Sequence, residues 1–166
     1  MQSEILRTHD GYIIRLCTPE QVKEVIDVNM KTLPEHYSDE FYYELLESFP
    51  EGFIVAQLGE KVVGYIMNRV EFGFSNMKSL SILRKGHVVS VAVLPEHRGK
   101  GLGRVLVEEG LRAAKEKGCR EMYLEVRVTN SVAIRLYESL GFSIKQKLYR
   151  YYRDGEDAYL MARPLN

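Results

Sequence analysis

Hydrophobic positions along the chain follow two different spacings, and these spacings divide it into strands and helices. Short apolar runs rich in β-branched residues, such as Ile13–Cys17, predict strands. Apolar residues that recur every three or four positions predict helices. The first helix follows Thr18 and Gln21, which have the spacing of a capping box, and Ser38 is placed to cap a second. The apolar faces of these two helices comprise Val22, Val25, Ile26, Met30 and Leu33, and Phe41, Leu45, Leu46 and Phe49.

The pattern continues with strands and helices through the rest of the chain. Residues 53–58 and 61–70 predict two strands joined in a hairpin at Gly59-Glu60. The connection over residues 71–85 is long enough to suggest a functional loop rather than a spacer. His87 to Leu94 is almost continuously apolar, as in a strand covered on both faces. The remaining predicted elements are helices over 101–117 and 133–140 and strands near 122–128, 142–148 and 157–163.

The predicted order, β-α-α-β-β-β-α-β-α-β-β, is that of a mixed α/β fold with about seven strands and about four flanking helices. The central β-α-β passage should be parallel and right-handed, as such crossovers are. No repeat, low-complexity stretch or linker interrupts residues 1–166, so we expect a single domain.

Composition narrows the classes of partner. Lys plus Arg and Asp plus Glu both number 23, so the formal net charge is zero and gives no electrostatic basis for binding nucleic acid or an anionic membrane. We expect Cys17 and Cys119 to be two separate buried thiols, and a single disulfide between them is the alternative. No export segment opens the chain, so we expect a cytoplasmic protein. No cluster of His, Cys, Asp or Glu has the spacing of metal ligands, so we expect no metal site.

The glycine-rich stretch after the 87–94 strand is the most informative part of the sequence. Three alternating glycines let the main chain approach a ligand without interference from Cβ atoms. The helix behind them offers unpaired N–H groups and the positive end of its dipole, which favour an anion. The spacing matches neither the dinucleotide fingerprint nor the P-loop, and a tightly packed turn is the structural alternative. The predicted pyrophosphate cradle comprises Arg98, Gly99, Lys100, Gly101, Leu102, Gly103 and Arg104.

Two motifs in this order are similar to the signatures of the GNAT superfamily of N-acetyltransferases. Arg98-x-x-Gly101-x-Gly103 matches the signature Q/R-x-x-G-x-G/A, and Asn130-x-x-Ala133-x-x-Leu136-Tyr137-x-x-x-Gly141-Phe142 resembles the second signature. The resemblance covers nearly the whole chain and implies acetyl-CoA as the cofactor and a central parallel pair of strands that splays apart. It also implies cofactor contacts from Asn130, from Tyr137 and from the main chain of Val91, Ala92 and Val93.

Three further segments, residues 33–35, 86–90 and 151–159, resemble the archaeal protein N-terminal acetyltransferases and the catalytic subunit of the eukaryotic NatA complex. This resemblance implies acetyl transfer to the α-amine of protein N-termini, with the ribosome as one place of action. The chain stops at Asn166 without the long tail of the eukaryotic subunit. We therefore expect a monomer or weak homo-oligomer rather than dependence on a large auxiliary partner.

Two polar residues interrupt strands that are otherwise apolar. His87 opens one strand and Glu125 lies within another, and polar residues in strands covered on both faces need a reason. Burial raises the pKa of a glutamate towards neutrality, where histidine already titrates, so both residues suit a general base. If the two strands are neighbours, both side chains can point into one cleft. The structural alternatives are a strand-end histidine and an ion pair between Glu125 and Arg127.

The family resemblance gives roles to three further groups of residues. Tyr137 would donate to the departing sulfur, although it also lies on the apolar stripe of its helix. A bend at Leu33, Glu35 and Tyr37 and a late loop at Tyr151 and Tyr152 would form two walls of a peptide groove. From the sequence alone, these segments are more simply a helix-ending bend and surface tyrosines.

Three other activities share some or all of these motifs. A RimI-like enzyme for one ribosomal protein has all of them, and a small-amine acetyltransferase needs an acidic closed pocket rather than tyrosine walls. A non-catalytic acyl-CoA sensor needs the glycine loop but no base. A terminal α-amine has a pKa of about 7.7–8.0, roughly 2.5 units below that of lysine, which favours N-termini over internal lysines.

Overall fold

The fold opens with a tight hairpin that the hydrophobic pattern does not reveal. The computed structural model describes residues 4–78 and 80–166. Its first strands, β1 (Ile5–His9) and β2 (Tyr12–Leu16), pair antiparallel around Asp10 and Gly11, whose φ angles are 48° and 84°. Two successive left-handed residues are what a type I′ turn requires, and Asp-Gly is a preferred sequence for it. The dipeptide was therefore the signal for β1, rather than any periodicity.

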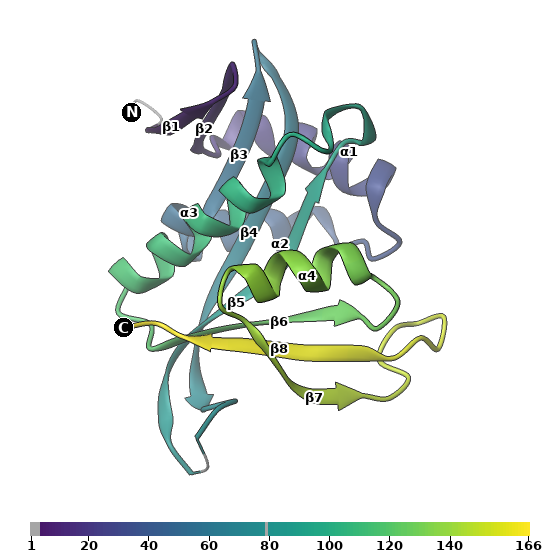
Figure 1. The fold of residues 1–166 in the computed structure, drawn as a ribbon. Coiled ribbons are helices and arrows are strands. Elements are labelled where there is room, and N and C mark those ends of the chain that lie inside the picture. Colours follow the sequence, from purple (N-terminus) through teal and green to yellow (C-terminus); the bar gives the residue numbers. More distant parts are fainter. Residues whose placement is uncertain (1–3, 79) are drawn as a thin grey trace. The chain divides into compact units, whose positions relative to one another are not determined.

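The described residues form two compact units. The first comprises Met1–Arg69 and Val89–Ala113, and the second comprises Val70–Val88 and Ala114–Asn166. Three elements contribute residues to both units: the strands β4 (Lys61–Phe74) and β5 (Ile82–Val93) and the helix α3 (Leu102–Glu116) (Figure 1).

In the first unit, hydrogen-bonded strands follow the order β1-β2-β3-β4-β5, with β3 at Phe53–Leu58. Helix α2 (Asp39–Ser48) begins after Ser38 as the sequence predicts, whereas the residues after Thr18 first form a 3₁₀ turn, η1 (Pro19–Gln21), which leads into helix α1 (Val22–Thr32). The main-chain N–H of Thr18 donates to the Gln21 side chain (3.1 Å), and the Ser38 hydroxyl accepts from the third residue of α2 (3.3 Å). Both predicted caps are therefore confirmed.

In the second unit, the strand order is β4-β5-β6-β8-β7. Helix α4 (Ser131–Ser139) connects β6 (Glu121–Arg127) to β7 (Ser143–Leu148), and Figure 1 shows β8 (Ala158–Pro164, yellow) between β6 and β7. The strands β5 and β6 form the predicted parallel pair. Their ladder ends at the pair His87↔Tyr123, although both strands continue. His87 thus lies where the parallel pairing stops.

The connection predicted over residues 71–85 differs from the prediction. Strand β4 reaches Phe74 and β5 begins at Ile82, so most of this stretch is paired strand, and the Ser75 N–H donates to the Ser81 carbonyl at 2.8 Å. The polar and glycine residues at 71 and 73 interrupt the apolar run, which is why the strand seemed to end at Val70. With β1 added, the described residues hold eight strands and four α-helices in a mixed α/β fold.

Both cysteines are buried and free. Burial raises the pKa of the Cys17 thiol to about 12 and also raises the pKa of Cys119, so both are unreactive thiols. Among the described helices, none has the length and apolar character that a membrane crossing requires.

Candidate active site

The second unit contains a histidine held between two carboxylates. The Nε2 atom of His87 lies 2.7 Å from Glu125 Oε1 on β6, and its Nδ1 atom lies 3.2 Å from Glu71 Oε2 on β4. The Tyr123 ring stacks on the imidazole, with centroids 4.3 Å apart and planes 1° from parallel. The Tyr123 hydroxyl donates to Glu71 Oε1 at 2.5 Å. We call these four residues the His87 cluster.

Strand geometry explains why the cluster forms. Side chains two positions apart point to the same face, so Tyr123 and Glu125 share a face of β6. The parallel register pairs His87 with Tyr123, which places the imidazole beside that face. The predicted proximity of His87 and Glu125 is therefore confirmed. The sequence pattern does not predict the roles of Glu71 and Tyr123: Glu71 is a lone acidic residue just beyond the predicted end of its strand, and Tyr123 lies in an apolar run.

The charge state of His87 follows from competing effects. The side chain is 11% exposed, and burial alone lowers the pKa of an imidazole. The hydrogen bonds to Glu125 and Glu71, together with their charges, outweigh burial and raise the pKa of His87 above its ordinary value. In the imidazolium form, each ring N–H donates to one carboxylate. Within the described residues, no group of His, Cys, Asp and Glu has the arrangement of a metal site.

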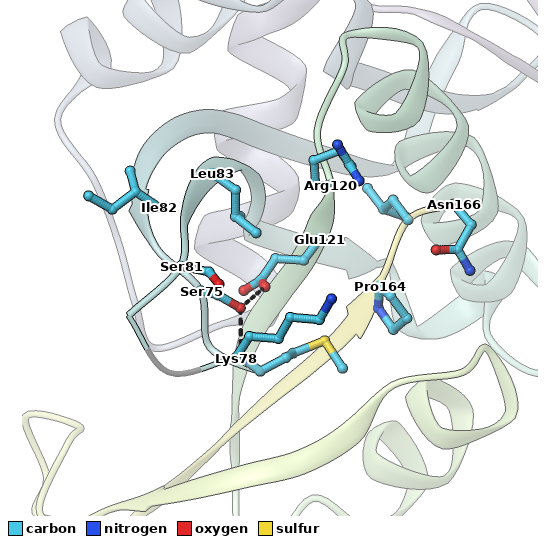
Figure 2. Close-up of a pocket in the computed structure, with 11 residues that line it drawn as sticks. Ser75, Lys78, Ser81, Ile82, Leu83, Arg120, Glu121, Pro164 and Asn166 are labelled. Atoms are coloured by element: carbon cyan, nitrogen blue, oxygen red, sulfur yellow. Dashed lines mark hydrogen bonds between the residues drawn. The ribbon is translucent and has the colours of Figure 1, made fainter.

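A hollow of about 430 Å³ also lies in the second unit. Figure 2 shows the Glu121 carboxylate in it, bonded to the Ser75 hydroxyl at 2.6 Å. The main-chain N–H of Asn76 donates to the other carboxylate oxygen at 2.7 Å, and the Ser75 oxygen accepts the N–H of Lys78 at 2.9 Å. Glu121 is 2% exposed, so its charge is used to hold the turn between β4 and β5.

The second predicted motif lies on helix α4. The Asn130 side chain accepts the Ala133 N–H at 3.2 Å and caps the helix, so a structural task accounts for its place in the motif. The cofactor contact of Asn130 stays a prediction. Tyr137 is buried, with its ring edge-on to Phe142 at 6.0 Å, and burial raises the pKa of its phenol to about 12. Tyr137 therefore keeps its proton throughout the physiological range.

Arg127 organises the connection between β7 and β8. Its Nη1 atom bonds to Asp154 Oδ2 at 2.9 Å and to Glu156 Oε1 at 2.6 Å. Its guanidinium carbon lies 4.0 Å from the centre of the Tyr152 ring, and Tyr151 meets Tyr152 edge to face at 5.0 Å. Arg127, which the sequence offered as a partner for Glu125, thus bonds to this loop and orients its tyrosines.

The glycine stretch lies in the first unit. Between β5 and α3, residues 98–101 are exposed and follow a short 3₁₀ turn, η3 (Pro95–His97). Gly99 and Gly101 have φ angles of 76° and 83°, which glycine adopts without steric cost. The Arg98 Nε atom donates to the carbonyl of Val93 at 2.9 Å, so this side chain turns back towards β5. The stretch presents main chain to solvent, as the prediction of an anion cradle requires.

The bend from Leu33 to Tyr37 is tied to β5 by buried polar groups. The Asn29 amide donates to the Glu35 carbonyl at 3.1 Å and to the Tyr65 hydroxyl at 3.0 Å. Tyr65 lies 2.7 Å from the hydroxyl of Ser90, and the Tyr37 hydroxyl donates to a main-chain carbonyl of β5 at 3.3 Å. Sequence patterns missed this network, because Asn29 occupies a position of α1 that the helical period also allows to be exposed.

Comparisons with known proteins agree with one another. Residues 22–142 match the acetyltransferase (GNAT) family. The chain is 49% identical to the N-alpha-acetyltransferase of Sulfurisphaera tokodaii over 156 residues, which is 93% of each chain. It is similar to a chain of the NatC complex solved with Gag peptide and CoA, with a TM-score of 0.84 and 26% identity over 94% of this chain and 99% of that one. Ard1 from Thermoplasma volcanium has a TM-score of 0.80 and 29% identity with the same coverage.

Proposed function

This chain belongs to the acetyltransferase (GNAT) family, and we propose that it transfers the acetyl group of acetyl-CoA to the α-amine of protein N-termini, with Glu125 as the base. The name of the Sulfurisphaera tokodaii relative and the CoA and peptide of the NatC structure support the reaction. One observation carries the choice of site: His87 is held between Glu71 and Glu125. Placing a buried histidine between two half-buried carboxylates is costly, and packing alone does not require it.

The two candidate bases take different parts in the reaction. A raised pKa favours the imidazolium form of His87, which has no lone pair to accept a proton. Glu125 then takes the proton from the amine as its nitrogen attacks the thioester. The carboxylate oxygen that faces His87 is already bonded, so the other oxygen is the one that meets the amine. The bond to His87 fixes the orientation of Glu125.

The residues of the first unit fit acetyl-CoA. The exposed main chain of residues 98–101, with two glycines in left-handed conformation, leaves room for a pyrophosphate beside the N–H groups at the start of α3. Arg98, Lys100 and Arg104 supply positive charge, and the main chain of residues 91–93 holds the thioester. Acetyl-CoA supplies the activated acetyl group. These roles rest on the match of the glycine stretch to the family signature.

Tyr137 stabilises the leaving group by donating a hydrogen bond. A phenol with a pKa of about 12 is a weaker acid than a thiol, whose pKa is about 8.5. Complete proton transfer from Tyr137 to a thiolate is therefore uphill, whereas an O–H···S hydrogen bond lowers the energy of the developing charge. Tyr137 acts as a donor that keeps its proton.

The Leu33–Tyr37 bend and the tyrosines at 151 and 152 are the segments that we propose to bind the substrate peptide. The buried Asn29 network supports one wall, and the stacking of Arg127 on Tyr152 supports the other. Tyrosines offer flat apolar area and a hydroxyl for peptide carbonyls. A groove that holds main chain would accept several first residues, with small ones such as Ser or Ala favoured.

We place the enzyme in the cytoplasm, with nascent chains at the ribosome as substrates. Two free, unreactive thiols support a reducing compartment.

Two short peptides test the reaction. Both begin with Ser and contain one lysine, and one of them is already acetylated at its N-terminus. The enzyme should acetylate only the free N-terminus, as mass spectrometry of the products would show. Equal acetylation of both peptides would make the protein a lysine acetyltransferase. A wider panel of first residues separates a general N-terminal enzyme from one that serves a single ribosomal protein.

A further inference from the structure

The N-terminal hairpin β1–β2 contacts the glycine stretch and the two elements that flank it. The His9 Nε2 atom lies 2.7 Å from the main-chain oxygen of Lys100, inside the glycine stretch. The Tyr12 hydroxyl lies 2.8 Å from Nδ1 of His97 in η3, and the two rings meet edge to face at 5.6 Å. Further along β1, Arg7 bonds to Glu108 of α3 at 3.3 Å. The hairpin therefore touches the turn before the glycine stretch, the stretch itself and the helix after it.

The contact with Lys100 has a consequence for the next residue. In a trans peptide, the C=O and the following N–H point in opposite directions, and the described chain contains no cis peptide. Because the Lys100 carbonyl accepts a hydrogen bond from His9, the N–H of Gly101 points away from the hairpin. The glycine pair at 99 and 101 has no Cβ atom to limit rotation of the intervening peptide planes. Without His9, this plane can turn and present its carbonyl where the N–H had been.

We propose that the β1–β2 hairpin braces the cofactor loop, with His9 as the positioning residue that aims the Gly101 N–H at the pyrophosphate of acetyl-CoA. The proposal rests on the proposed function of residues 98–104. His9 acts only through the Lys100 peptide, so its task is to prepare the loop rather than to touch the reacting atoms. A flipped peptide would put a carbonyl oxygen against a phosphate, which repels it.

Two further observations fit this brace. An added Cβ atom on Gly101 would lie 3.1 Å from His9 Nε2, so the imidazole packs closely against the glycine. The Nε2 atom bears a proton both in the imidazolium and in one neutral tautomer, so His9 can donate in either charge state. Tyr12 is buried, and its bond to His97 holds the turn that leads into the stretch.

The test compares binding with turnover in four variants. His9→Ala removes the donor, and His9→Gln retains an N–H at similar reach. Tyr12→Phe removes the second bond of the hairpin. Thr8→Ala is the matched control, because Thr8 is the exposed neighbour of His9 on the same strand. Isothermal titration calorimetry gives the acetyl-CoA Kd, and steady-state kinetics with a Ser peptide give kcat and the peptide KM.

We expect His9→Ala to weaken acetyl-CoA binding roughly three- to tenfold, the loss of about one hydrogen bond. The kcat at saturating acetyl-CoA and the peptide KM should stay as in the wild type. His9→Gln should recover most of the affinity, Tyr12→Phe should lose less than His9→Ala, and Thr8→Ala should lose none. In NMR spectra, the Gly101 amide should shift on adding CoA in the wild type and in His9→Gln, but much less in His9→Ala.

Unchanged affinity in a folded His9→Ala variant, or a loss in His9→Gln as large as in His9→Ala, overturns the brace. If His9→Ala does not fold, the remaining variants and the wild-type NMR spectrum test the brace. Full acetyl-CoA affinity in Tyr12→Phe, together with a wild-type Gly101 amide that does not shift on adding CoA, also overturns it. A wild-type protein that binds no acetyl-CoA would instead contradict the proposed function, so the two failures are distinguishable.

Discussion

The two regions that the proposed reaction needs are built in opposite ways. The glycine stretch of the first unit is exposed over residues 98–101 and offers its main chain. The His87 cluster of the second unit is buried at His87 and offers side-chain charges, each fixed by a neighbour. The first region depends on open space around its peptide groups. The second depends on which polar atom, oxygen or nitrogen, stands at each position.

This difference decides which changes each region tolerates. In the glycine stretch, a side chain can change freely where it points to solvent, but a Cβ atom added at Gly101 meets His9 Nε2 at 3.1 Å. In the His87 cluster, exchange of a single oxygen for nitrogen keeps the shape and alters the chemistry. Substitutions of these two kinds therefore test the comparison, with the largest effect expected where the reacting proton is held.

Glu125→Gln is the sharpest change in the cluster. It keeps the volume of the side chain and removes its basicity, so kcat should fall on the order of a hundredfold or more while the acetyl-CoA Kd barely moves. Glu121→Gln is the matched control, because Glu121 is a buried carboxylate on the same strand that bonds to Ser75 instead. The control should lower the melting temperature and leave kcat intact in the folded enzyme. Near-normal kcat in Glu125→Gln would mean that the amine loses its proton in solution.

Gly101→Val tests the other region. The residue has a φ of 83°, and an added Cβ atom would lie 3.1 Å from His9. We expect acetyl-CoA affinity to fall at least about tenfold, because a branched side chain at this left-handed position meets His9 and forces the glycine stretch to shift. Gly59→Val carries a similar backbone strain at a φ of 59°, but nothing lies within 4 Å of the added Cβ. Calorimetry that finds equal affinity in both variants would place the cofactor elsewhere.

Glu71→Gln removes one charge from the cluster without touching the base. His87 should lose part of the interaction that raises its pKa, so the imidazolium should lose its proton at a lower pH than in the wild type. We expect kcat to fall roughly tenfold, since a charged hydrogen bond that orients the imidazole is lost. An NMR titration of the histidine rings reads the pKa directly. A His87 pKa equal to that of the wild type would show that Glu71 does not control the cluster.

Stability should depend on pH through the same group. The folded-state pKa of His87 is raised above its ordinary value, so the folded state binds the proton more tightly than the unfolded chain. The stabilisation is fully present below about pH 6.5 and is lost as the pH rises through the folded-state pKa. The free energy of unfolding, from urea titrations, should decline less steeply over this range in Glu71→Gln. Parallel pH profiles for the two proteins would contradict this coupling.

Tyr152→Phe is the mildest change and concerns the substrate groove. Loss of one hydroxyl from a peptide carbonyl should raise the peptide KM about two- to tenfold, with kcat unchanged, which corresponds to roughly 0.5–1.5 kcal/mol. The stacking of Arg127 on the ring should persist, because it needs only the aromatic face. A peptide KM that does not change would remove the Tyr152 hydroxyl from the groove.

The elements and the conformation of the glycine stretch were accessible from the sequence. The periodicity of Val22 and Val25, the caps at Thr18 and Ser38 and the glycines at 99 and 101 are local signals. Each depends on backbone sterics and on hydrogen bonds within a few residues, so a short stretch of sequence is enough to predict it. The pairing of His87 with Glu125 was also predictable, since both are polar residues that interrupt apolar stretches of two strands expected to be neighbours.

Only the tertiary structure decided which distant side chains meet. Glu71 reaches His87 because β4 continues past the point where its apolar run ends, and His9 reaches Lys100, 91 residues away, because an Asp-Gly turn adds a strand at the edge. Arg127 bonds to Asp154 and Glu156. These contacts depend on strand register, and a shift of one residue would turn every side chain to the opposite face. Register follows from the packing of the whole sheet, which no short stretch of sequence encodes by itself.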